Sequence, residues 1–85
     1  MDRPLIVNIN MFDMAQSIYY PNGRIGYAYK DALKELIPQI CYEENVYNVE
    51  IRGPLNYTEK LIQEIKEEEL TTYNKNKIQI KGVQN

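Results

Sequence analysis

One stretch constrains the fold of this chain more than any other: an alternating segment at 46–52, the dipeptide Gly53-Pro54, a long helical pattern and a second alternating segment at 77–81. Alternation of apolar and polar side chains predicts strands with one buried face, and Gly-Pro ends the first of them. Asn56 with Glu59 three residues later forms a capping box, which predicts the start of the helix. Two strands joined by a helix make a parallel unit that crosses over right-handed in about 98% of cases.

Three strands and another helix are predicted ahead of this unit. The same alternation predicts strands at 5–12, 17–20 and 24–29, and the sequence Tyr-Pro-Asn-Gly at 20–23 joins the last two as a hairpin. A helix follows, because apolar residues recur there with helical spacing: Leu33, Leu36, Ile37, Ile40 and Cys41. Pro38 lies inside this stripe and predicts a kink or a break, since proline removes a backbone hydrogen bond.

The predicted order of elements is therefore β-β-β-α-β-α-β in a single domain, residues 1–85. This order resembles the ribonuclease H-like superfold, which the actin-like proteins share. The resemblance implies an α/β fold with a mixed five-stranded sheet in the order 3-2-1-4-5. Simple connection rules give the same order, with both helices on one face of the sheet. The buried stripe of the second helix is predicted to comprise Tyr57, Leu61, Ile62, Ile65 and Tyr73.

If both helices cover one face of the sheet, the other face should be more polar. The outward positions of the first, fourth and fifth predicted strands fit this expectation: Asn8, Asn10, Asn48, Glu50, Arg52, Lys77, Gln79 and Lys81. Ile6, Phe12 and Val46 interrupt the polar set. The face is either simply solvated, or it is a docking surface on which these three side chains make the apolar contacts.

Tyrosine marks a second candidate interaction site. The chain has eight tyrosines against one phenylalanine and no tryptophan, and Tyr19, Tyr20, Tyr27 and Tyr29 surround the predicted hairpin. Tyrosine is enriched at interfaces because it combines a rigid apolar ring with a polar tip. These rings either serve an interface or face the helices within the fold.

The acidic residues do not form an obvious metal site. The resemblance to ribonuclease H-like nucleases implies several carboxylate ligands, one of them an Asp in the first strand. Here that strand offers Asn8 and Asn10, and a neutral amide is a poor magnesium ligand beside a carboxylate. Asp13 follows the strand and Glu50 has no obvious acidic partner, so a minimal metal-dependent nuclease is only the alternative prediction. We therefore predict no metal ligands and no catalytic residues.

Other chemistry has little support in the sequence. It contains no histidine to act as a general base and no glycine-rich phosphate loop. Cys41 lies on an apolar stripe, where it is expected to be a small buried hydrophobe. A small nucleotide or another anion could bind at Arg52 and Gly53, because free backbone N–H groups begin the following helix. An ordinary strand-to-helix turn explains the same two residues, and no cofactor is predicted.

Charge and length set the remaining expectations. The net charge of −2 and the pI of about 5.1 give no broad attraction to nucleic acid or anionic membranes. No apolar run approaches the roughly 20 residues of a membrane span. Residues 1–4 lack the layout of a signal peptide, so a cytoplasmic location is expected.

Self-association is the expected source of extra stability. A chain of 85 residues builds a modest core, and its single cysteine allows no internal disulfide. The main prediction is a small non-catalytic protein-interaction module. It binds a protein partner, most simply its own copy in a homo-oligomer, through the tyrosine-rich hairpin or the open sheet face.

Overall fold

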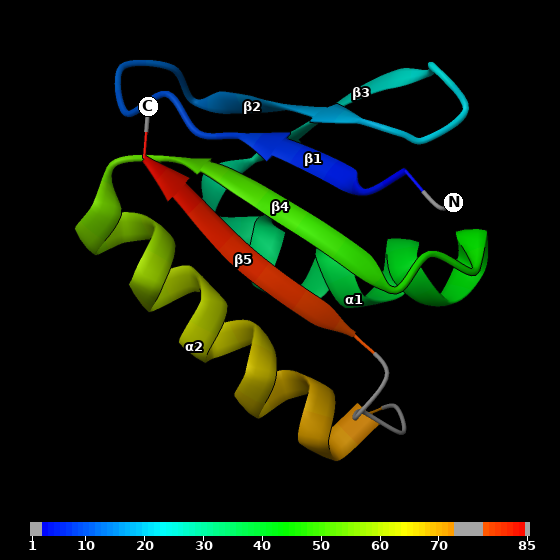
Figure 1. Ribbon diagram of the computed structural model, residues 1–85. Coiled ribbons are helices and arrows are strands. Elements are labelled where there is room, and N and C mark those ends of the chain that lie inside the picture. Colours follow the sequence, from blue (N-terminus) through cyan, green and yellow to red (C-terminus); the bar gives the residue numbers. More distant parts are fainter. Residues whose placement is uncertain (1–2, 73–77, 85) are drawn as a thin grey trace.

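The computed structural model describes residues 3–72 and 78–84 of the chain. Within these ranges, five strands form one mixed sheet and two helices pack against it (Figure 1). The elements are β1 (Leu5–Asn8), β2 (Ala15–Tyr19), β3 (Ile25–Tyr29), a 3₁₀ turn (Lys30–Ala32), α1 (Leu33–Glu44), β4 (Asn48–Gly53), α2 (Leu55–Thr72) and β5 (Gln79–Gln84). The α/β class and the strand order β3-β2-β1-β4-β5 confirm the fold predicted from the sequence.

β1 lies at the centre of the sheet and joins its two halves. On one side it pairs antiparallel with β2, which in turn pairs antiparallel with β3. On the other side it runs parallel to β4, which runs parallel to β5. α1 leads from β3 across to β4, and α2 leads from β4 to β5. The long connections are therefore the two helices, as the predicted topology requires.

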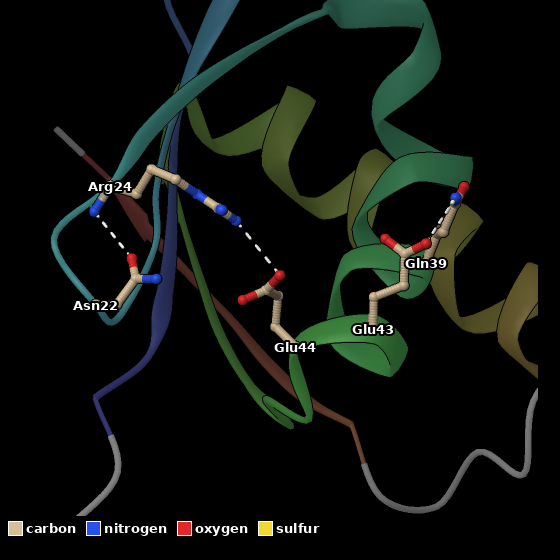
Figure 2. Close-up of polar contacts among 5 residues, drawn as sticks. All are labelled: Asn22, Arg24, Gln39, Glu43 and Glu44. Carbon is tan, nitrogen blue, oxygen red and sulfur yellow. Dashed lines mark hydrogen bonds and ion pairs between the residues drawn. The ribbon is translucent and has the colours of Figure 1, made fainter.

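Both helices cover the same face of the sheet. Figure 2 shows the strands nearly edge-on, with α1 and α2 on one side of them. One apolar core fills the space between the layers, and the two helices contact each other across it. Its buried members are Leu5, Val7, Ile9, Ile18, Leu33, Ile37, Ile40, Cys41, Val49, Ile51, Leu61 and Ile65. The opposite face, called the open face below, has even-numbered residues of β1 and β4 and odd-numbered residues of β2, β3 and β5.

β1 is shorter than the strand predicted at 5–12. It ends at Asn8, although Ile9 remains buried and still donates its backbone N–H to the carbonyl of Arg52. The chain then turns away from the sheet, because the buried side chain of Gln16 binds the backbone of Asn10. β2 consequently begins two residues earlier than predicted, and β3 begins one residue later.

α1 runs from Leu33 to Glu44 without a break at Pro38, so of the predicted kink or break, the break is wrong. Pro38 is itself fully buried, between apolar residues of the stripe that packs on the sheet. Packing of that stripe holds the helix together across the missing hydrogen bond, because tertiary contacts contribute most of the stability of a helix. The helix ends at Asn45, which adopts the left-handed conformation (φ 55°) that asparagine tolerates.

The predicted capping box does not start α2. The helix begins at Leu55, so Asn56 and Glu59 lie inside it. Pro54 stands immediately before the helix, and its carbonyl accepts the backbone N–H of Thr58 at 2.9 Å. Proline suits a helix start because the first N–H groups have no partner within the helix.

The rest of the predicted α2 stripe is confirmed where the structure describes it. Leu61 and Ile65 are buried, while Tyr57 and Ile62 are half-buried against the core. Tyr73 lies outside the described residues, as does position 77 of the last predicted strand. β5 extends further than predicted, to Gln84.

Candidate interaction surface

Large apolar side chains are exposed mainly in one region of the molecule. Among the described residues, nine such side chains are exposed, and seven of them come from β2, β3 and the β1–β2 loop. The seven are Met11, Phe12, Met14, Tyr19, Ile25, Tyr27 and Tyr29. Single exposed apolar residues are ordinary, whereas a concentration of this kind makes the region a candidate interaction surface.

β3 places three of the seven side chains on the open face. Ile25, Tyr27 and Tyr29 are 52, 70 and 66% exposed, and they alternate with the half-buried Gly26 and Ala28. This alternation is the one that a strand with a solvated face requires. The sheet register places Tyr19 of β2 directly beside Ile25 on the same face. We call these four exposed side chains, Tyr19, Ile25, Tyr27 and Tyr29, the hairpin edge.

β3 is also the end strand of the sheet. The backbone N–H of Tyr20 reaches the carbonyl of Arg24 at 2.9 Å, and that of Lys30 reaches the carbonyl of Met14 at 3.3 Å. In an antiparallel ladder the hydrogen-bonded residues alternate, so the even-numbered residues of β3 bond to β2. Its odd-numbered residues direct their N–H and C=O groups away from the sheet. Between positions 25 and 29 there is no charged residue and no proline, the usual protections of a free edge.

One buried side chain holds the β1–β2 loop. Gln16 is only 1% exposed, and its Oε1 accepts the backbone N–H of Asn10. Its Nε2 donates to the carbonyls of Asn10 (3.1 Å) and Asp13 (2.7 Å). The side chain of Asn10 continues the network by accepting the N–H of Phe12 (3.0 Å) and donating to the carboxylate of Asp13 (2.9 Å). Gln16 was not among the predicted functional residues, because position 16 precedes the strand predicted at 17–20.

This network presents three apolar side chains to solvent. Phe12 is 97% exposed, Met14 78% and Met11 45%. We call these three the loop knob. A groove of about 720 Å³ lies between the loop knob and the start of the 3₁₀ turn, and Tyr29 lines it as well. The apolar surface therefore continues from β3 into the loop.

Tyr20 is not part of the exposed surface, which corrects the expectation that all four hairpin tyrosines belong to one site. A Cβ atom added to Gly26 would lie 3.2 Å from the Tyr20 ring, so the ring lies over the helix side of β3. The guanidinium of Arg24 lies 4.3 Å from the centre of the same ring and pairs with Glu44 at 3.3 Å (Figure 2). Tyr20 and Arg24 thus connect the β2–β3 turn to the end of α1.

The three apolar residues predicted on the open face are not brought together there. Ile6 is half-buried on that face, between Tyr19 of β2 and Glu50 of β4. Phe12 lies beyond the end of β1, in the loop. Val46 precedes β4 and packs against the core. Of the three, the structure places Ile6 alone on the open face.

The β4–β5 half of the open face is ionic. Glu50 is 9% exposed, and its carboxylate accepts a hydrogen bond from Nε of Arg52 and lies 3.6 Å from Nζ of Lys81. The hydrogen bond from Arg52 lowers the pKa of Glu50 despite the opposing effect of burial, and the charges of Arg52 and Lys81 lower it further. Both cations contact the one carboxylate of Glu50, so the group carries a net charge of +1 and is held together by this residue.

Contacts within the fold account for both residues of the predicted anion site, Arg52 and Gly53. The guanidinium of Arg52 is engaged by Glu50. Gly53 lies so close to β1 that an added Cβ would come within 2.7 Å of the Cβ of Ile9. Close strand packing therefore accounts for this glycine.

The acidic residues proposed for a nuclease belong to separate arrangements. Asp13 is bound to Asn10 in the loop, whereas Glu50 belongs to the ionic group on β4 and β5. Within the described ranges, no group of three or more His, Cys, Asp or Glu residues could hold a metal ion. Cys41 is buried in α1, as expected. The exposed apolar surface is consequently the best-defined candidate site.

Comparison with protein-family models, with characterised proteins and with solved structures finds no match for this chain. The resemblance to ribonuclease H-like proteins therefore rests on the order of the elements alone. No helix in residues 3–72 combines the length and apolar character needed to cross a bilayer.

Proposed function

We propose that this chain is a small, non-catalytic protein-interaction module that self-associates through the hairpin edge. The observation that carries the proposal is the coincidence, on β3, of an uncharged free strand edge with three large exposed side chains. The adjoining part of the open face and the loop knob extend the contact surface.

The size of the surface favours a cooperative contact. Removing one exposed tyrosine ring from water contributes about 2 kcal/mol to the free energy of association, at about 25 cal/mol per Å² of apolar surface. Association of two molecules costs on the order of 4–15 kcal/mol in lost freedom. Several side chains must therefore be covered together, and seven lie within this one region. A second copy supplies the same apolar surface, so both copies gain from a single contact.

Solution mass tests the proposal. Light scattering coupled to size-exclusion chromatography, run across a wide range of protein concentration, should show a rise from monomer to oligomer. Tyr27→Lys should lower the association strongly, because it places a charge in the centre of the contact. Tyr42→Lys is the matched control, since Tyr42 is 64% exposed on α1 and Tyr27 is 70% exposed on β3. A chain that stays monomeric at every concentration would contradict the proposal.

A further inference from the structure

We infer that the second copy adds to β3 edge to edge and antiparallel, so that two five-stranded sheets become one continuous sheet. This inference rests on the self-association proposed above and identifies the contact that produces it. Tyr27 lies at the centre of the contact, opposite Tyr27 of the second copy.

The backbone of β3 is arranged for this pairing. Its odd-numbered residues already direct their N–H and C=O groups out of the sheet. With Tyr27 opposite its own copy, Ile25 faces Tyr29 of the second copy. Three such pairs exchange two hydrogen bonds each, about six in all. A shift of two residues removes one of the three pairs, so the register centred on Tyr27 is favoured.

The side chains leave room for the second strand on both faces. On the helix side, β3 itself carries the small residues Gly26 and Ala28, and the Tyr20 ring over Gly26 comes from the end of β2, the inner neighbour of β3. On the open face, the two Tyr27 rings become neighbours and Ile25 lies beside Tyr29 of the second copy. Aromatic and apolar pairs across neighbouring strands stabilise a sheet.

The two cations that flank β3 are held on the helix side. In the centred register Arg24 lies opposite Lys30 of the second copy, and two like charges there would oppose pairing. The guanidinium of Arg24 is already paired with Glu44 at 3.3 Å. The ammonium of Lys30 lies 5.6 Å from the centre of the Tyr57 ring in α2. Both charges are therefore drawn toward the helix layer and away from the free edge.

Edge pairing is also favoured over stacking of two open faces. Face-to-face stacking would cover the ionic group of Glu50, Arg52 and Lys81, and removal of paired charges from water is unfavourable. It would also leave the outward groups of β3 without partners. Edge pairing keeps the ionic half in water and satisfies those groups.

Disulfide trapping distinguishes edge pairing of β3 from stacking of two open faces. In the centred register the Cα atoms of position 27 in the two copies are about 5.5 Å apart, within the range that a disulfide spans. Tyr27→Cys should therefore form a covalent dimer under mild oxidation, doubling the mass on a non-reducing gel. Ser17→Cys is the matched control, because Ser17 neighbours Tyr27 in the sheet register. In an edge-paired dimer the two copies of position 17 lie three strand spacings apart, about 14 Å. The wild type reports any background from the buried Cys41.

The outcomes together distinguish edge pairing from the self-association on which it rests. A concentration-dependent oligomer in which Tyr27→Cys cross-links and Ser17→Cys does not supports both. An oligomer in which Tyr27→Cys fails to cross-link overturns edge pairing and leaves self-association standing, and cross-linking of Ser17→Cys then indicates stacked faces. A wild-type chain that remains monomeric by light scattering overturns both.

Discussion

Replacing Gln16 by methionine should destabilise this protein by about 2 kcal/mol, because the change removes three hydrogen bonds while keeping the side-chain volume. The amide of Gln16 is buried and holds the backbone of Asn10 and Asp13 in the β1–β2 loop. A net contribution of about 1 kcal/mol per hydrogen bond gives about 3 kcal/mol in total. Water can reach part of the loop and replace some of these bonds, which reduces the expected loss to about 2 kcal/mol.

Urea unfolding at 25 °C measures this loss. A slope of about 1 kcal/mol per M is expected for so small a chain, so the midpoint should fall by roughly 2 M. Gln39→Met is the matched control, because Gln39 is exposed and makes one 3.3 Å hydrogen bond to Glu43, one turn away on α1 (Figure 2). Such a pair contributes only about 0.2–0.5 kcal/mol.

Hydrogen exchange gives a second, local readout. The backbone N–H of Asn10 donates to Oε1 of Gln16, so its exchange should become faster in Gln16→Met. Equal free energies of unfolding for Gln16→Met and Gln39→Met would refute the argument that Gln16 holds the loop. So would an unchanged exchange rate at Asn10.

Three further results are expected. Gly53→Ala should destabilise the fold by about 2–3 kcal/mol in urea unfolding, because the added Cβ would lie 2.7 Å from the Cβ of Ile9. Gly82→Ala, with its nearest contact at 3.2 Å, should change stability by less than about 1 kcal/mol. Similar losses for the two variants would contradict the packing argument. Arg52→Met should raise the pKa of Glu50. The folded-state pKa of Glu50 lies below the ordinary 4.5, so its interaction with Arg52 stabilises the fold above that pH, and this stabilisation is lost as the pH falls. The difference in urea midpoint between the wild type and Arg52→Met should therefore shrink in acid. Tyr27→Pro should fold but lose association, because the N–H that it removes points away from β2; an oligomer of unchanged mass would argue against edge pairing.

The sheet could be predicted because one face of it is buried. Buried residues such as Ile9, Val49 and Ile51 alternate with polar residues, and that alternation fixes which side chains lie beneath the helices. With the faces known, connection rules leave few strand orders for a chain of this element order. The topology therefore followed from local patterns together with these connection rules.

Two errors arose where a neighbouring contact or residue overrides the pattern from which the element was predicted. Alternation continues to Phe12, but Gln16 binds the backbone six residues earlier and turns the chain away after Asn8. Asn56 has the residue type of a cap, yet the helix already begins after Pro54. The hydrogen bonds of Gln16 have no signature in a short window of sequence, whereas Pro54 is itself a signal of a helix start that outweighs the cap pattern at Asn56.

The candidate surface was predicted only in part: its seven exposed apolar residues include Phe12 and three of the predicted tyrosines, but also Met11, Met14 and Ile25, which were not predicted. Tyr19 and Tyr20 are adjacent, so a strand directs them to opposite faces. The hairpin register decides which face each one takes, and it joins Tyr19 to the exposed set with Ile25. Phe12 was predicted to be exposed on a strand of the open face. It is exposed because it lies in the β1–β2 loop.

The two end strands of the sheet differ in a way that favours strand pairing at β3. Both β3 and β5 are end strands within the described part of the chain, so each presents unpaired backbone groups on its outer side. β5 carries Lys81, whose side chain is 71% exposed, and α2 packs against this strand. Charge and cover of this kind are the means by which proteins keep an edge from pairing. β3 has no charged residue and instead exposes Ile25, Tyr27 and Tyr29. The edge at β5 is thus protected, whereas the edge at β3 is neutral and apolar. A contact that forms by strand pairing at only one edge requires this asymmetry.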